Sequence, residues 1–166
     1  MVGTWTVQGN QARGSSTTNG SIVFGSTSSA NGSIEATIAR NGNTGWDTYV
    51  IVNANAAASD LLLANWWSNA NGRIDLWKEV AGTFTLITSV SGLYPGGVGT
   101  APASAVVRLE SPSTSVVKVY LDGVLKITYT LSGSEQTTYK NSTHRYAGFG
   151  ANNDGVSTFD NLHLDA

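Results

Sequence analysis

Apolar and polar residues alternate with a period of two along most of this chain, the pattern of β-strands that bury one face. Turn signals such as Asn19-Gly20 and Asp154-Gly155 separate the alternating segments. Residues 54–64, rich in alanine and leucine, are better explained by a loop and a strand than by a helix. The pattern therefore predicts no convincing helix and a series of strands at residues 3–8, 11–15, 20–25, 32–40, 48–53, 61–67, 73–80, 83–90, 104–110, 115–121, 124–130, 145–150 and 157–164.

The sharpest of these signals lies in residues 115–130. Two alternating apolar runs flank Asp122-Gly123, a pair that readily takes positive φ at both central positions of a type I′ turn. We therefore predict a two-residue hairpin that joins residues 115–121 to residues 124–130. Such hairpins favour an all-β fold, a two-sheet antiparallel jelly-roll sandwich, over one domain of residues 1–166.

The faces of the predicted strands place tryptophans on opposite sides. In residues 73–80, Ile74 and Leu76 share one face, while Trp77 lies on the other face among charged residues, where a core position is hard to sustain. Only one of Trp66 and Trp67 can point inward if their strand is regular. We assign Trp66, together with Trp46, to the core.

The polar faces of three strands together form a candidate ligand site. Aromatic rings stack on the faces of sugars, and amide and guanidinium groups bond to their hydroxyls. The alternative is that these aromatic residues fill the core or an oligomer contact. The candidate ligand-binding residues are Tyr49, Asn65, Trp67, Arg73 and Trp77.

Composition excludes several classes of function. Only 12% of the residues are charged, the net charge is −2 and no basic run occurs, so neither nucleic acid nor an anionic membrane is an expected partner. Cysteine is absent, which excludes disulfides, Cys-based zinc sites and thiol catalysis. No segment reads as a transmembrane span or a signal peptide, so ordinary secretion is not encoded here.

Five motifs in order resemble the concanavalin A-like, laminin-G-like jelly rolls: GTWTVQGNQA, GSIEATI, an aromatic middle, VKVYLDGVLKITYT and YAGFGANNDGVSTFDNLHL. They are most similar to the copies in minor tail proteins of phages that infect actinobacteria. The resemblance covers nearly the whole chain. It implies two curved sheets, one concave and often used for glycans, and a place on a virion or other extracellular surface. It fixes no activity, because this fold hosts many functions.

One feature departs from that resemblance. In such domains GTWTVQGNQA normally follows an opening strand of the form D-x-F-x-R, which would lie against the last strand. Here Met1 directly precedes Val2-Gly3. Either the chain has been shortened or residues 157–164 lack their usual neighbour and are able to pair with another chain.

Catalytic groups are sparse. A retaining glycosidase needs two carboxyl groups about 5–5.5 Å apart, whereas Asp75 and Glu79 lie four residues apart, about 13 Å along a strand. We interpret Asp75, Lys78 and Glu79 as a solvated face. A lyase could use His144 and Tyr146, but the chain has only two histidines. We predict no enzyme activity, with a polysaccharide hydrolase or lyase as the distant alternative.

No cofactor is expected, and calcium is the metal to consider. Asn152, Asn153, Asp154 and Asp160 carry hard oxygen donors close together in sequence, and related jelly rolls often bind a structural Ca²⁺. The same residues equally form a good turn.

Two functions remain in competition. The first is a non-catalytic adhesion module that binds glycan or cell-wall polysaccharide. The second is a structural virion or decoration subunit whose aromatic residues bury against other subunits or further copies of the chain.

Overall fold

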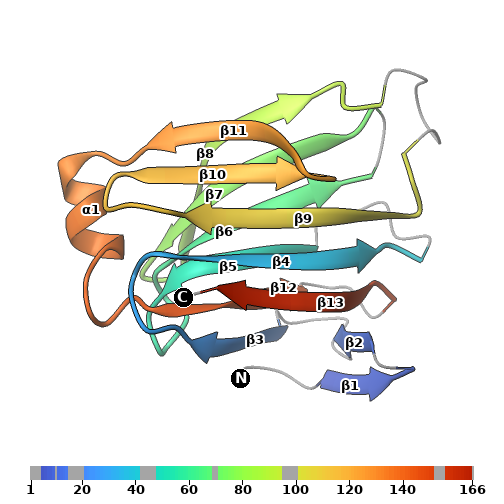
Figure 1. The fold of residues 1–166 in the computed structure, drawn as a ribbon, viewed down its shortest axis with the longest axis horizontal. Coiled ribbons are helices and arrows are strands. Elements are labelled where there is room, and N and C mark those ends of the chain that lie inside the picture. Colours follow the sequence, from blue (N-terminus) through green and yellow to red (C-terminus); the bar gives the residue numbers. More distant parts are fainter. Residues whose placement is uncertain are drawn as a thin grey trace.

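The computed structural model describes residues 5–9, 11–14, 21–41, 48–68, 71–94, 101–151 and 156–165, whose strands form two facing antiparallel sheets (Figure 1). In the seven-stranded sheet the order is β1-β2-β13-β4-β9-β10-β11. Its strands are β1 (Trp5–Gln8), β2 (Gln11–Gly14), β4 (Gly32–Ala39), β9 (Ser104–Ser111), β10 (Val116–Leu121), β11 (Val124–Thr130) and β13 (Thr158–Asp165).

The six-stranded sheet lies behind it in Figure 1, in the order β3-β12-β5-β6-β7-β8. Its strands are β3 (Ser21–Ser26), β5 (Thr48–Ala54), β6 (Leu61–Trp67), β7 (Arg73–Val80), β8 (Thr83–Ser91) and β12 (Tyr146–Ala151). The predicted two-sheet antiparallel jelly roll is confirmed, because every predicted strand is present with bounds that differ by at most a few residues.

The core lies between the two sheets and takes alternate residues from strands such as β4, β9 and β10. Phe149 of β12 stacks on Phe159 of β13 with 4.6 Å between ring centroids, which joins the sheets directly. Burying one large apolar side chain stabilises the fold by about 1.5–3 kcal/mol. The members include Ile34, Ile38, Val50, Val52, Trp66, Ile74, Leu76, Val107, Leu109, Val119, Phe149 and Phe159.

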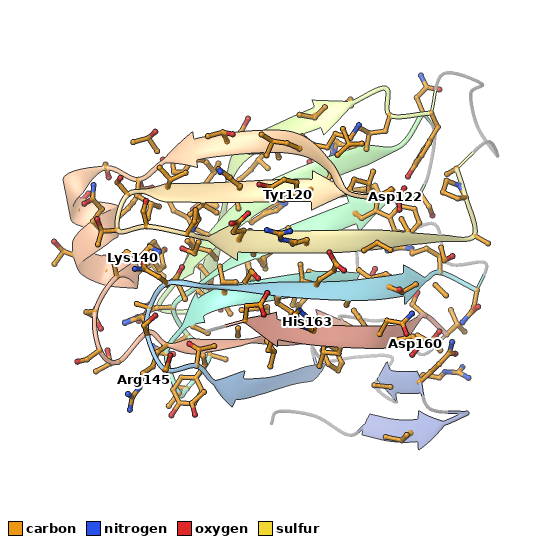
Figure 2. All side chains as sticks on the ribbon, in the orientation of Figure 1. Tyr120, Asp122, Lys140, Arg145, Asp160 and His163 are labelled. Atoms are coloured by element: carbon orange, nitrogen blue, oxygen red, sulfur yellow. The ribbon has the colours of Figure 1, made fainter. Side chains whose placement is uncertain are left out.

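The predicted hairpin is confirmed. Asp122 and Gly123 have φ values of 50° and 76°, and Leu121 pairs with Val124 across the turn. Asp122 Oδ1 also accepts a 2.8 Å hydrogen bond from the backbone of Val106, which ties the turn to β9. Asp122 is labelled at the tip of this hairpin in Figure 2.

The prediction of no helix is wrong for one segment, α1 (Gly133–Tyr139), which lies at one end of the sandwich (Figure 1). Its capping box pairs Ser132 with Glu135, a local signal that period-two reasoning does not detect. Glu135 also accepts hydrogen bonds from Lys78 Nζ at 2.7 Å and from the Tyr129 hydroxyl at 2.9 Å. Burial by itself would raise the pKa of Glu135, but these hydrogen bonds outweigh burial and lower the pKa to about 2.

The last strand does have neighbours. β13 pairs with β4 along most of its length, and β2 pairs with it at Thr158 and Phe159. These pairs involve β2 and β4 and not an opening strand of the form D-x-F-x-R, so the expectation that residues 157–164 lack that usual neighbour stays a prediction. Within the described part of the chain, no helix is both long and apolar enough to cross a membrane.

Candidate functional site

Strand β7 presents two different faces, as its alternation predicts. Ile74 and Leu76 are fully buried between the sheets, whereas Trp77 packs on the opposite, outward face of the six-stranded sheet. Strand β6 repeats the arrangement, with Trp66 at 0% exposure in the core and Trp67 half-buried on the outward face. The core assignment of Trp66 is confirmed, and Trp46 lies outside the described residues.

Strand register brings the five predicted site residues onto that outward face. Tyr49 of β5 pairs with Asn65 of β6, Trp67 pairs with Arg73 of β7, and Leu63 pairs with Trp77. Because cross-strand partners lie side by side on the same face of a sheet, residues up to 16 positions apart in sequence become neighbours. Their contacts with ligands stay a prediction.

One carboxylate organises the polar half of this face. Asp75 is 0% exposed, and its Oδ2 accepts hydrogen bonds from Trp67 Nε1 at 2.7 Å, from Arg73 Nε at 3.1 Å and Nη2 at 2.8 Å, and from Trp77 Nε1 at 3.4 Å. The guanidinium carbon of Arg73 stands 4.2 Å from the centroid of the Trp67 ring. The carboxylate therefore holds two indoles and one guanidinium in a single arrangement, which we call the Asp75 cluster.

This arrangement corrects the interpretation of Asp75, Lys78 and Glu79 as a solvated face. Asp75 and Glu79 are both buried, and Lys78 turns to the other side of β7 and pairs with Glu135. A buried carboxylate is stable only when charged or polar partners compensate it, and Arg73 with the two indoles supplies that compensation.

Tyr49 and Asn65 form the floor of the face rather than its projecting groups. Both side chains are buried, and Asn65 Nδ2 donates a 3.0 Å hydrogen bond to the carbonyl of Thr48. The ring of Tyr49 lies over Gly150 of β12, where an added Cβ would stand 2.3 Å from Tyr49 Cε2. Gly150 thus leaves the space in which this ring lies flat across the sheet.

The other half of the outward face is apolar. Ile51, Leu61 and Leu63 are buried there beneath Trp77 and Tyr146. The neighbouring edge strand β8 continues the surface toward solvent with two exposed side chains, Phe84 at 49% and Leu86 at 43%. These pair with Glu79 and Trp77 respectively. Alternation in residues 83–90 is the signal that could have added them to the predicted patch.

Glu79 lies within this apolar half and has an unusual environment. Burial first, and then the nearby charge of Asp60, raise the pKa of Glu79 to about 7. Its Oε2 has no hydrogen-bond partner among the described residues. The sequence spacing of Asp75 and Glu79 does place both on one face of β7, but Asp75 is covered by Trp67 and Arg73.

The two residues considered for a lyase have different packing partners. His144 is buried, with its ring edge-on to Tyr139 at 6.3 Å and its Nε2 3.7 Å from Asp60 Oδ2. Tyr146 instead packs on the outward apolar cluster. Both residues also line one cavity of about 10 Å³, which has room for about one water molecule and not for a sugar ring.

The candidate calcium ligands fall mostly outside the described residues, which exclude Asn152, Asn153 and Asp154. Asp160, labelled on β13 in Figure 2, accepts hydrogen bonds from the backbone of Asn161 at 2.7 Å and from Gln11 at 3.3 Å. In the described ranges, no group of three or more His, Cys, Asp or Glu residues is placed to hold a metal ion.

A hollow that was not predicted lies on the outer face of the seven-stranded sheet. It is a cleft of about 370 Å³ whose lining includes Asn31, Ser33, Arg108, Glu110 and Asp165. Its charged groups already pair, because Arg108 Nη2 lies 2.9 Å from Glu110 Oε2. The guanidinium of Arg108 also stands 4.8 Å from the ring centroid of Tyr120, labelled in Figure 2.

No protein-family profile and no curated protein matches this chain. Solved structures do match. The carbohydrate binding module CBM66 from Bacillus subtilis is 19% identical with a TM-score of 0.69, over 99% of this chain and 92% of that one.

Two further structures resemble it. A tetrameric galectin from the ball sponge Cinachyrella sp. is 12% identical with a TM-score of 0.56, over 88% of this chain and 100% of that one. Mouse laminin α1 chain domains LG4-5 are 12% identical with a TM-score of 0.57, over 99% of this chain and 44% of that one. At such identities the likeness shows the fold alone, a two-sheet antiparallel jelly roll.

Proposed function

We propose that this chain is a non-catalytic saccharide-binding module whose ligand lies on the outward face of the six-stranded sheet, over Trp67, Arg73 and Trp77. The Asp75 cluster is the observation that carries the proposal. It sets aromatic rings and a guanidinium in fixed positions on one open face, and such groups stack on sugar rings and bond to their hydroxyls. Tyr49 and Asn65 support these groups from below.

The energetic cost of the cluster supports a role beyond stability. Asp75 Oδ2 takes four hydrogen bonds, while its Oδ1 has no donor among the described residues. A buried acceptor left without a donor costs about 1–3 kcal/mol. A packed apolar cluster would stabilise this face without that cost, so a ligand-positioning function accounts for the cluster better than folding alone.

The names of the matching structures support the same proposal, since one is a carbohydrate binding module and another is a galectin. For the setting, we propose an extracellular or virion surface, on which the domain would bind glycan or cell-wall polysaccharide. That part rests on the sequence motifs shared with phage minor tail proteins, GTWTVQGNQA above all.

A structural role in a virion or an oligomer is the second candidate. Phe84 and Leu86 are exposed on the edge strand β8, where another subunit could cover them. Light scattering on the purified chain separates the two proposals. A monomer that binds saccharide favours the first, and a stable oligomer without saccharide binding favours the second.

The test of saccharide binding uses a glycan array followed by calorimetric titration. Trp67→Ala and Trp77→Ala should weaken binding at least about tenfold, as expected for aromatic residues at the centre of an interface. Trp77→Ala should also lose about 1–3 kcal/mol of stability, because its ring is half-buried on the apolar cluster.

Tyr120→Ala is the matched control for these variants. Tyr120 is a half-buried aromatic residue beneath an arginine, but it lies on the other sheet. Its substitution should leave saccharide affinity unchanged. If Tyr120→Ala abolishes binding while Trp67→Ala does not, the ligand lies on the seven-stranded sheet and the proposed site is wrong.

A further inference from the structure

We propose that the site is selective for neutral saccharides over uronate or sulfated ones, and that Asp75 is the residue that sets this selectivity. The inference rests on the proposed function and deepens it. Asp75 acts through Arg73, Trp67 and Trp77, so it is a positioning residue. Three observations support this proposal. Arg73 is the one cation on the outward faces of the described strands β5 to β8, it is hydrogen-bonded to Asp75, and the carboxylate of Asp75 is buried.

Arg73 is the only positively charged side chain on the outward faces of β5, β6, β7 and β8 among the described residues. The other cation of these strands, Lys78, turns away and forms a 2.7 Å ion pair with Glu135 of α1. Among the described residues of these four strands, an anionic sugar therefore meets one guanidinium, that of Arg73.

That guanidinium is already engaged. Arg73 donates hydrogen bonds to Asp75 Oδ2 from both its Nε and its Nη2, at 3.1 Å and 2.8 Å. Paired donation from two nitrogens is how arginine recognises a carboxylate or a sulfate, and Asp75 occupies that edge. One of the two flat faces of the group is also covered, because it lies over the ring of Trp67.

The opposing charge is buried while the arginine is partly open. The side chain of Asp75 is 0% exposed and that of Arg73 is 35% exposed. Water therefore screens the carboxylate poorly, and the positive charge it faces is locally cancelled. Glu79 adds negative charge to the same face above its pKa of about 7, which burial and Asp60 raise. An anionic sugar therefore finds no uncompensated positive charge on this face with which to form an ion pair.

A neutral sugar binds through ring stacking and hydrogen bonds to its hydroxyls, and the Asp75 cluster leaves groups available for both. The half-buried indoles of Trp67 and Trp77 offer stacking surface, and both are aimed by hydrogen bonds from their Nε1 atoms to Asp75. The remaining nitrogen of Arg73 can donate to a hydroxyl without needing a charged acceptor. The Asp75 carboxylate thus has two effects: it neutralises the charge of Arg73, and it fixes the orientation of the two indole rings.

The experiment measures the binding of the full chain to neutral oligosaccharides, oligogalacturonates and sulfated oligosaccharides on one array, with titration of the best ligand of each class. The wild type should bind neutral ligands at least about tenfold more tightly than the anionic ones. Asp75→Asn keeps the size of the side chain but removes its charge. It should lower the affinity for neutral ligands and raise the affinity for anionic ones, so that the difference between the two affinities shrinks.

Glu110→Gln is the matched control. It removes the carboxylate of another arginine pair with the same spacing along a strand, Arg108–Glu110, which also lies beside an aromatic ring but on the opposite sheet. Its binding profile should equal that of the wild type. Equal affinity of the wild type for uronates and neutral sugars, or unchanged selectivity in a folded Asp75→Asn variant, overturns the inference while the proposed function stands.

A second measurement applies if Asp75→Asn does not fold. Binding of oligogalacturonate by the wild type, measured by titration, should be weak and should change less than about twofold between 50 and 500 mM salt, because the compensated guanidinium of Arg73 forms no net ion pair with it. A steep loss of affinity with salt overturns the inference. Binding of no saccharide of either class overturns the proposed function itself, and this inference with it.

Discussion

The ring of Tyr49 lies across the backbone of Gly150, a residue that its own strand pairs with directly in the six-stranded sheet. A Cβ at position 150 would stand 2.3 Å from Cε2 and 2.8 Å from the hydroxyl oxygen of Tyr49, which is far below contact distance. Only glycine at this position is compatible with the observed ring, so the floor of the candidate site depends on a residue that has no side chain.

Gly150→Ala should therefore displace Tyr49 without unfolding the chain. The atoms that must move belong to the far end of the tyrosine side chain, which can swing aside at a cost of about 1–3 kcal/mol. Saccharide affinity should fall, because the support beneath Asn65 and Trp67 changes. Calorimetric titration and thermal unfolding measure the two effects.

Gly25→Ala provides the control for that substitution. Gly25 lies in the same sheet on β3, and its added Cβ would meet its nearest neighbour, Leu164, at an ordinary 4.0 Å. Its affinity and stability should stay close to those of the wild type. Equal losses in both variants would mean that the sheet, and not Tyr49, responds to Gly150→Ala.

Gly123→Val should destabilise the chain by at least about 1 kcal/mol, because residue 123 has a φ of 76°, where a β-branched side chain is strained. Chemical denaturation measures the loss. Gly133→Ala, at the first position of α1, is the matched variant and should be neutral or slightly stabilising. A Gly123→Val variant as stable as the wild type would contradict the type I′ assignment.

Glu79 should make stability decline as the pH rises from 4.5 to 7. Its pKa is 4.5 when unfolded and about 7 when folded, because burial and Asp60 disfavour the charged form. The folded chain therefore holds a proton that the unfolded chain has released in this window, and its stabilising contribution is fully present only below pH 4.5. The loss across the window should be about 1–3 kcal/mol.

Urea unfolding at pH 4.5 and pH 7.5 measures that loss, and Glu79→Gln should remove it. The difference between wild type and variant isolates Glu79 from the other titrating groups. If the two proteins show the same change in stability with pH, the carboxyl group of Glu79 is not the source.

Glu135→Gln should lower the free energy of unfolding by about 1–3 kcal/mol at neutral pH, because it loosens the contact of α1 with the end of the sandwich. The substitution removes the charge that receives hydrogen bonds from Lys78, Tyr129 and the backbone of Ser132. Because the folded pKa of about 2 lies below the ordinary 4.5, this stability is present above pH 4.5 and is lost as the pH falls toward 2.

Glu110→Gln serves as the comparison for this variant as well. Its partner Arg108 is 38% exposed, so the pair is screened by water and its loss should cost less than about 1 kcal/mol. Thermal unfolding at pH 7 measures both variants. Equal costs would mean that the charge of Glu135 contributes no more than a surface ion pair.

The sequence by itself determined the strands and their faces. Period two and turn residues such as Asp122-Gly123 are local properties, and they determine which side of a strand each residue faces wherever the strand is regular. For that reason Trp66 could be assigned inward and Trp77 outward before any neighbour was known. The same reasoning missed α1, because its signal is the capping box from Ser132 to Glu135 and not a periodic pattern.

Only the tertiary structure decided what those faces contain. Asp75 looks like a solvated charge along its own strand, but pairing with β6 places Trp67 beside Arg73 and buries the carboxylate among them. Gly150 has no visible role until β12 lies against β5 and receives the Tyr49 ring. Burial, ion pairing and close approach arise from strand register between distant segments, and strand register is set by the packing of the whole sheet rather than by any one segment.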